Sequence, residues 1–144
     1  MLAATGRDLG ASRWLTIDLA RIDQFAEVTG DHVWLHVDPA RAASGPFGRT
    51  IAHGFLTLSL LNMFLQEMFM PENVDWGENY GVNRVRFPAP VPVGSQLRCH
   101  ARLISVRQTA PRVVQTTVQM SVEAGQDKSG CVAEMLQYYA FLLD

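Results

Sequence analysis

A long apolar run between Ile51 and Met70 constrains the fold of this chain more than any other feature. At a rise of about 1.5 Å per residue, a helix over this run is roughly 25 Å long. Apolar side chains cover most of its circumference, and its polar stripe is narrow: Ser59, Asn62 and Gln66. Polar groups inside the run would be costly in lipid. We therefore expect a buried central helix, beginning near His53, that the rest of the chain surrounds.

The second half of the chain supplies strands that can surround such a helix. Four segments have strand character: residues 80–87, 96–106, 112–123 and 131–143. Alternation is clearest in the second segment, where one face carries Leu97, Cys99, Ala101 and Leu103. Consecutive strands, without alternating βαβ units, predict an α+β domain in which an antiparallel sheet curls around the helix. One sheet edge stays free to pair with another subunit.

The N-terminal part contains shorter elements and two helix-capping signals. Residues 12–17 are predicted to form a short strand. Asp18 is a favourable N-cap for the helix that follows, and Gly30 is a favourable end for it. Asp38 with Pro39 predicts the start of a second, short helix. The segment between these two helices is therefore expected to be irregular.

Length and charge limit the possible functions. The 144 residues fit one domain, 1–144, and the formal net charge is −2 with scattered basic residues. Neither a nucleic-acid footprint nor a polybasic membrane patch is present, so a small neutral partner is favoured. Arg7 and Asp8 interrupt the N-terminus before a signal-peptide core can form, which predicts a cytoplasmic location. Cys99 and Cys131 form no CxxC pair and are expected to be buried free thiols.

Asp31 and His36 are the main candidates for catalysis. They are five residues apart, a spacing that an ideal helix would place on different faces, so they converge only if the backbone between them is irregular. A carboxylate and an imidazole that share one water form a base that can also donate a proton, as adding water to an activated double bond requires. The alternative, which spacing alone favours, is that Asp31 caps the next helix and His36 is an ordinary loop residue.

Gly54 is the second candidate, because it lies in the first turn of the long helix. Its N–H has no acceptor within the helix, and a substrate oxygen can approach closely where there is no side chain. The helix dipole adds positive potential at this end. Gly54 can therefore bind an oxyanion, or it can serve packing alone. His53 beside it is expected to be a packed or capping residue.

A metal site is not expected, although His32 and His36 stand four residues apart near Asp31 and Asp38. The zinc-protease pattern needs a continuous helix with Glu after the first His, and Val33 stands there instead. Nucleotide-binding loops and GxSxG are also absent from the sequence.

These residues resemble a known family. The segment from Gly30 to His36, followed by Ala52-His53-Gly54 and the long apolar helix, is similar to the MaoC-like (R)-specific enoyl-CoA hydratases. Trp34 and the segment 45–48 resemble the branch related to nodulation protein N. The resemblance implies a hot-dog fold over residues 1–144 that acts as a homodimer. The implied reaction is the hydration of trans-2-enoyl-CoA to (R)-3-hydroxyacyl-CoA, or its reverse, without a cofactor.

The resemblance also implies roles for individual residues. Asp31 and His36 would activate water and return a proton to the α-carbon, and the Gly54 N–H would bind the thioester oxygen. The expected substrate contacts are Trp34, Phe55, Asn62, Arg84 and Arg86, of which the two arginines could meet phosphates or form an ordinary exposed strand face. The family usually has Asn-Pro at Val33-Trp34, and its Asn is assigned to positioning water.

Two alternatives from other classes stay open. A hot-dog thioesterase generally uses a carboxylate on the central helix, where this chain offers only Glu67 near the far end. A non-catalytic acyl-thioester binding protein is favoured by Val33 but disfavoured by the retained Asp31 and His36.

Overall fold

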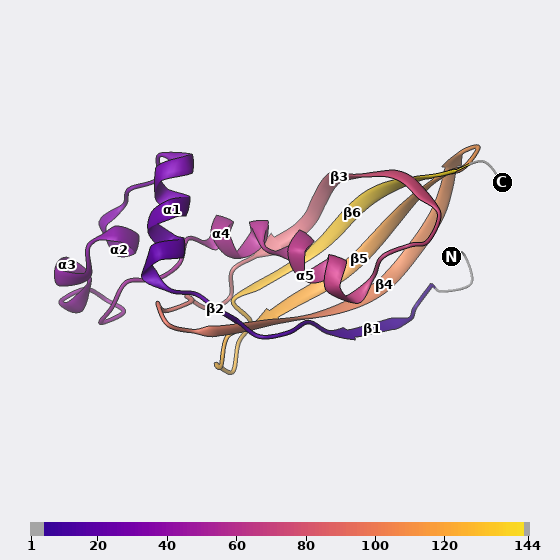
Figure 1. Ribbon diagram of the computed structural model, residues 1–144. Helices are drawn as coiled ribbons and strands as arrows, with labels where there is room; N and C mark the ends of the chain where they lie inside the picture. Colours follow the sequence, from indigo (N-terminus) through magenta and orange to yellow (C-terminus); the bar gives the residue numbers. More distant parts are fainter. Residues whose placement is uncertain (1–4, 143–144) are drawn as a thin grey trace.

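A curved antiparallel sheet forms most of the computed structural model, which describes residues 5–142 (Figure 1). Within this range the strands are β1 (Asp8–Ala11), β2 (Leu15–Thr16), β3 (Val74–Arg86), β4 (Gln96–Ala110), β5 (Val113–Glu123) and β6 (Cys131–Phe141). Their order is β1-β4-β5-β6-β3, and β2 pairs with β4 off this path. Every pair is antiparallel. The predicted α+β class is confirmed.

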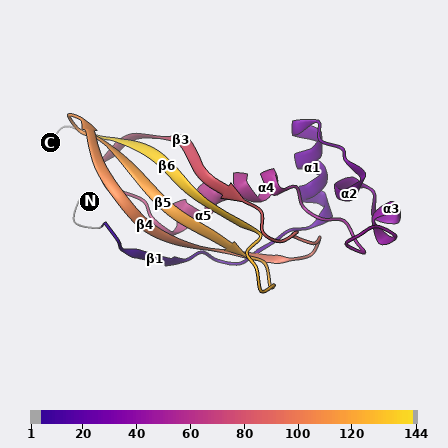
Figure 2. The same cartoon turned by 180° about the vertical axis from the view of Figure 1, so that it is seen from behind.

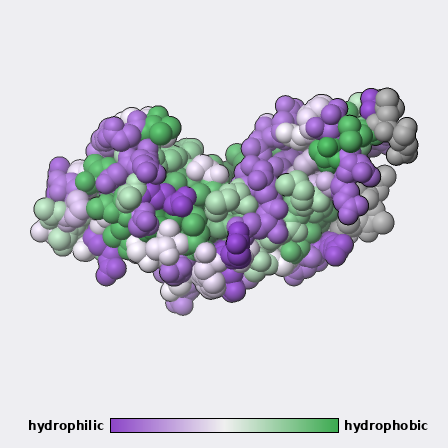
Figure 3. Space-filling view, in the orientation of Figure 1, coloured by the Kyte–Doolittle hydropathy of each residue, from purple (hydrophilic) through white to green (hydrophobic). Residues whose placement is uncertain are grey.

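The helices occupy two places relative to this sheet. They are α1 (Leu19–Thr29), α2 (Trp34–Val37), α3 (Pro39–Ala43), α4 (Gly54–Ser59) and α5 (Leu61–Met68). Helices α1 to α3 gather beyond one end of the sheet, whereas α4 and α5 lead from that end onto its concave side (Figure 1). The view from behind shows the strands crossing in front of α5 (Figure 2). The surface is hollowed between the helical end and the sheet (Figure 3). None of the described helices is long and apolar enough to span a membrane.

The predicted helix caps are confirmed. The Asp18 carboxylate accepts the Arg21 N–H at 2.9 Å, and Gly30 ends α1 with a φ of 75°, which favours glycine. The Asp38 carboxylate accepts the Arg41 N–H at 3.0 Å at the start of α3. These caps fix the ends of the segment that carries the site.

The predicted strand at residues 12–17 is wrong in its bounds, because Ser12 interrupts the pairing. The Ser12 N–H donates to the Cys99 carbonyl at 2.9 Å, and the Ser12 hydroxyl accepts the Cys99 N–H at 2.9 Å. A side-chain oxygen thus replaces the backbone acceptor that a continuous strand would supply. Pairing is divided between β1, which begins at Asp8, and the two-residue β2.

The central helix is divided into α4 and α5, where the sequence predicted one helix. The Leu60 N–H lies between two carbonyls, those of Leu56 at 3.2 Å and Thr57 at 3.3 Å, and the Ser59 hydroxyl donates to the Leu56 carbonyl at 2.7 Å. A serine bonded back to its own helix competes with regular geometry. Both parts still bury apolar side chains: Leu56, Leu61, Phe64 and Leu65.

The sheet confirms the predicted alternation and extends beyond the predicted bounds. Leu97, Cys99, Ala101 and Leu103 are all buried in the core. Strand β3 begins at Val74, paired with Phe141, rather than at residue 80. The predicted end of the last strand at residue 143 lies outside the described residues. Cys99 and Cys131 are buried free thiols as predicted, and burial raises the pKa of the Cys99 thiol to about 12 and that of Cys131 to about 11.

Candidate active site

The segment from Asp31 to His36 leaves α1 in a tight turn. Asp31 accepts the Val33 N–H on its own carboxylate at 3.3 Å, and α2 begins directly afterwards at Trp34. His36 lies in this single turn of helix, with its N–H bonded to the Val33 carbonyl at 2.9 Å. The Asp31 carboxylate therefore closes a turn with Val33, but α2 has no side-chain cap hydrogen bond, so the capping role considered for Asp31 is not observed. The same turn brings its carboxylate back towards His36.

Asp31, His36 and His53 form one cluster of side chains. A carboxylate oxygen of Asp31 and one ring nitrogen from each histidine all lie within 4.8 Å of one another. Asp31 is exposed, His36 is half-buried and His53 is buried. The Asp31 and His36 side chains, which sequence spacing alone placed apart, are thus together at one site.

The His36 ring is oriented by a backbone carbonyl from another segment. Its Nδ1 lies 2.7 Å from the Ile51 carbonyl oxygen, and the Ile51 N–H bonds back to the Leu35 carbonyl at 3.0 Å. Since a carbonyl can only accept, Nδ1 carries the hydrogen in the neutral ring. The lone pair of neutral His36 is therefore on Nε2. A histidine in this tautomer can act as a base at Nε2.

His53 is the site residue whose importance the sequence did not reveal. Its Nε2 lies 2.9 Å from the Asp31 carbonyl oxygen, and its ring stacks on His36 with centroids 3.9 Å apart. Phe25 contacts the same ring at a centroid distance of 4.9 Å. The expectation of a packed residue is confirmed, whereas a capping role is not, because its side chain makes no cap hydrogen bond at the start of α4. The sequence feature that could have indicated a role in the site was the position of His53 directly before a helix start.

The three side chains of the cluster are of types that can bind a metal ion. His36 and His53 each have one ring nitrogen on a backbone carbonyl, which leaves one nitrogen on each ring as a possible ligand. The two rings stack with their planes 26° apart. His32, the other histidine of the sequence pattern, lies 3.7 Å from Glu27 instead. The expectation of no metal stays a prediction.

Gly54 begins α4 between two cavities. One cavity, of about 310 Å³, is lined by His36, Gly54 and Phe87 among others, and the other, of about 370 Å³, is lined by Asp31 and Phe55 among others. A Cβ at Gly54 would lie 2.9 Å from the Phe87 ring, so this close approach requires glycine. The packing role considered for Gly54 is therefore present, alongside a backbone N–H that helix geometry leaves without an intrahelical acceptor.

Trp34 packs against neighbouring residues of its own loop, whereas Phe55 is exposed at the wall of a cavity. The Arg41 guanidinium lies over the Trp34 ring at 4.3 Å, and a Cβ at Gly45 would meet that ring at 2.9 Å. Trp34 thus packs within the loop that carries His36. Phe55 is 69% exposed and lines the cavity of Asp31. Substrate contacts for both residues stay predictions.

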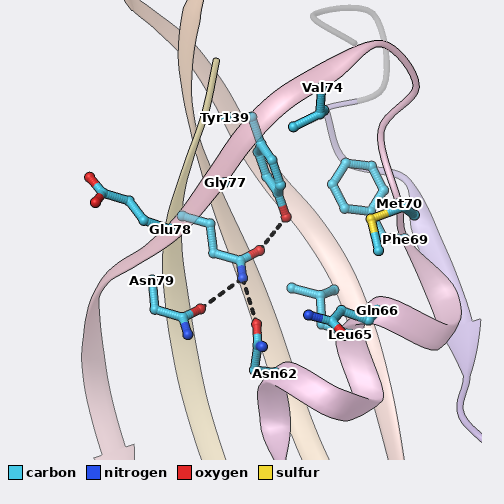
Figure 4. Close-up of a pocket in the computed structure, with 11 residues that line it drawn as sticks. Asn62, Leu65, Gln66, Phe69, Met70, Val74, Gly77, Glu78, Asn79 and Tyr139 are labelled. Carbon is cyan, nitrogen blue, oxygen red and sulfur yellow. Dashed lines mark hydrogen bonds between the residues drawn. The ribbon is translucent and has the colours of Figure 1, made fainter. Parts of the chain in front are cut away.

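Arg84, Arg86 and Asn62 are not among the residues that line the two cavities at the cluster. Arg84 has a φ of 53° in a bulge of β3 and an ion pair with Glu134 at 3.4 Å. The Arg86 guanidinium donates to the Val85 carbonyl at 2.7 Å. Asn62 lies on α5, where it lines the cavity drawn in Figure 4 and also a second cavity. Their contacts with substrate stay predictions.

The sheet around α5, with the cluster of Asp31, His36 and His53 at the start of α4, defines a hot-dog protein. Residues 1–126 match the family model described as a MaoC like domain. 3-Hydroxyacyl-thioester dehydratase Z of Mycobacterium tuberculosis (strain ATCC 25618 / H37Rv) is 49% identical over 140 residues, 96% of this chain and 93% of that protein. The chain belongs to the MaoC-like dehydratase family. The resemblance found in the sequence is confirmed.

Two further proteins are similar to this chain. Nodulation protein N of Rhizobium leguminosarum bv. viciae is 46% identical over 120 residues, 82% of this chain and 74% of that protein. The structure of the (R)-hydratase from A. caviae superimposes with a TM-score of 0.76 at 24% identity, covering 92% of this chain and 94% of that one. The second likeness supports the hot-dog fold.

Proposed function

We propose that this protein adds water to trans-2-enoyl-CoA to give (R)-3-hydroxyacyl-CoA and catalyses the reverse dehydration. The expected enzyme class, a hydratase or dehydratase of acyl thioesters, is confirmed by the family and by the dehydratase among the relatives. The observation that carries the proposal is the convergence of the Asp31 carboxylate and the His36 ring within 4.8 Å.

The proposed reaction uses Asp31 and His36 as a pair. A water molecule bound between the carboxylate and His36 Nε2 gives up a proton to the pair as its oxygen bonds to C3 of the enoyl group. The electrons of the double bond move towards the thioester carbonyl, whose oxygen becomes negative. The pair then returns a proton to C2, so that H and OH have been added and the site regains its starting state.

The developing negative charge needs a donor, and the Gly54 N–H is our candidate. It opens α4 beside the cavity that His36 also lines. A preorganised backbone donor stabilises an oxyanion more than the neutral carbonyl from which it forms. Removal of water from the cavity strengthens this interaction, and the Phe87 ring packed on Gly54 contributes to that exclusion.

We also infer that His53 is a positioning residue. Its Nε2–H donates to the Asp31 carbonyl and its face supports the His36 ring, so one buried side chain fixes both members of the pair. Among the described residues its Nδ1 is buried without a hydrogen-bond partner. A lone pair at that position is less costly than an unpaired N–H, which agrees with the Nε2–H tautomer.

Substitutions at His53 can separate these two contacts. We expect His53→Phe, which keeps a ring but loses the donor, to lower kcat by about 10-fold or more with little change in KM, since misplacing a catalytic group mainly affects the transition state. His53→Gln keeps an amide donor near Nε2 and should recover much of kcat. Equal losses in the two folded variants would argue against positioning of Asp31 through this hydrogen bond.

The thioesterase alternative finds less support in the contacts of Glu67. Its carboxylate accepts the Arg13 backbone N–H at 3.0 Å and lies 3.4 Å from the Arg13 guanidinium. Glu67 is thus engaged near the end of α5, away from the cluster at the start of α4. Glu67 is therefore not placed to act as the base for thioester hydrolysis at the cluster.

Crotonyl-CoA distinguishes the reactions directly. We expect the purified protein to remove the enoyl absorbance by hydration without releasing thiol, because Asp31 and His36 form an acid/base pair and not a nucleophile. Absorbance and a thiol reagent followed in the same reaction provide the measurement. Thiol release equal to substrate loss would select the thioesterase, and specific binding without turnover would select a binding protein.

We further propose that the working unit is a homodimer joined at β3. This edge strand pairs only with β6 among the described strands, and its side chains include exposed Trp76, Tyr80 and Val82. An open edge of this length is a liability in solution, and two-fold pairing would satisfy it. Sedimentation at micromolar concentration is expected to give twice the chain mass, and a stable, active monomer would contradict this. We also propose a cytoplasmic location.

A further inference from the structure

Three cavities follow one another along α4 and α5. The first, of about 370 Å³, contains Asp31, and it shares Leu58 and Ser59 with a second of about 220 Å³. The second shares Asn62 and Asn79 with a third of about 200 Å³. Cavities with common walls are neighbours. A groove therefore leads from the Asp31 carboxylate along the helices and beside β3.

The walls of this groove change from mostly apolar to a mixture of polar and apolar side chains along its length. Near Asp31 the walls include Phe25, Phe55 and Leu58. At the far end four polar side chains meet from three elements: Asn62 of α5, Asn79 of β3, and Gln137 and Tyr139 of β6. Figure 4 shows the labelled members of this amide cluster pointing towards one another, whereas Glu78 points away from it.

The hydrogen bonds within the amide cluster show which of its atoms donate and which accept. The Gln137 amide donates to the side-chain oxygens of Asn62 and Asn79, both at 2.9 Å, and the Tyr139 hydroxyl donates to the Gln137 oxygen. Gln137 and Tyr139 are buried, and burial raises the pKa of Tyr139 to about 12, so it remains a donor. Every bond to Asn62 and Asn79 here engages their oxygens. Within residues 5–142, neither side-chain NH₂ group donates to a protein acceptor.

These NH₂ groups lie where the second and third cavities join, so an acyl chain that extends along the groove would reach them. A hydrocarbon end would remove water from the two donors without replacing its hydrogen bonds, which is unfavourable. A chain bearing an oxygen at that point would accept from them. Sites that hydrogen-bond a substrate group discriminate strongly against analogues that lack it.

We propose that the preferred substrates are acyl thioesters whose chain carries a hydroxyl or keto oxygen near its distal end, bound by the NH₂ groups of Asn62 and Asn79. This inference rests on the proposed hydratase function. From Leu58 to Asn62 the helix advances roughly 6 Å, so a crotonyl group is too short to reach the amide cluster. Pairing of two β3 edges uses backbone groups and leaves the Asn79 side chain in place.

Matched substrates test the proposal. For a series of trans-2-enoyl-CoA chain lengths, kcat/KM is measured with the plain chain and with the same chain carrying a terminal hydroxyl. At the chain length that reaches the amide cluster, we expect the hydroxylated substrate to be favoured by about 10-fold or more. Asn62→Leu and Asn79→Leu should each bring this ratio close to about 1, because each removes a donor at similar side-chain volume.

A surface amide provides the control. Gln119 is exposed on β5, between the buried Val118 and Met120, so its side chain faces away from the groove. Gln119→Leu should leave the ratio unchanged. Circular dichroism checks the fold of each variant, and Asn79→Leu, at an exposed strand position, serves if Asn62→Leu does not fold.

The outcomes separate this inference from the function on which it rests. If the wild type hydrates crotonyl-CoA but favours plain chains at every length, the distal oxygen proposal is wrong and the hydratase function stands. The same holds if both asparagine variants keep the wild-type ratio. If no enoyl-CoA is hydrated, the proposed function itself fails.

Discussion

Asp31→Asn and His36→Gln are each expected to lower the turnover of crotonyl-CoA by roughly 10²–10⁴. Asn keeps a side-chain oxygen that can accept the Val33 N–H, and Gln is close to histidine in length, although its amide nitrogen takes the place of Nε2 and not of the Nδ1 that bonds the Ile51 carbonyl. Both changes remove the group that exchanges protons at similar side-chain size. Steady-state rates, with near-ultraviolet circular dichroism as the test of native packing, provide the measurement.

The double variant shows whether the two residues act as a unit. Because both groups bind the same water in the proposed reaction, the first substitution removes most of what the second could remove. The combined loss should be far smaller than the product of the single losses. A folded single variant with nearly wild-type turnover would remove that residue from the mechanism, and fully multiplicative losses would mean that the two act independently.

The second large effect is expected at Gly54, and Phe87 must be changed first to measure it. Any Cβ at Gly54 lies 2.9 Å from the Phe87 ring, so a direct substitution would combine a clash with the loss of a donor. In a Phe87→Ala background the space is available. There, Gly54→Pro removes the N–H, whereas Gly54→Ala retains it with a comparable Cβ.

We expect Gly54→Pro to be about 10²–10³ slower than Gly54→Ala in this background, the usual effect of losing one oxyanion donor. Proline is accepted at the first position of a helix, and His53 before it already has an extended ψ of 137°. The comparison uses kcat on crotonyl-CoA. Equal rates in two folded proteins would assign Gly54 to packing alone.

The local signals in the sequence predicted local structure well. Asp18, Gly30 and Asp38 cap the helices as expected because each cap depends on atoms within a few residues. Alternation predicted the buried face of β4 because one side of that strand meets the core. The same reasoning predicted an irregular backbone from Asp31 to His36, which holds only for the turn at Asp31, because the short helix α2 begins at Trp34 and contains His36.

Contacts between distant segments were not predictable in the same way. Strand β3 begins six residues before the predicted start, where Asp75 and Gly77 disfavour a strand and pairing with β6 decides the structure. Ser12 replaces a backbone acceptor with its hydroxyl, and the choice between strand and interruption depends on Cys99, 87 positions away. His53 acquires its role only when Asp31 and His36 are placed against it.

Both histidines of the site are held through main-chain oxygens, those of Ile51 and Asp31. Every residue type supplies such an oxygen, so the hydrogen bond that orients His36 would survive replacement of the Ile51 side chain. This hydrogen bond depends on the path of the backbone. The Ala52 N–H donates to the Val91 carbonyl at 2.8 Å, which holds that backbone against the neighbouring segment. The site can therefore tolerate changes of side chain around it during evolution more readily than an insertion or deletion between residues 49 and 54.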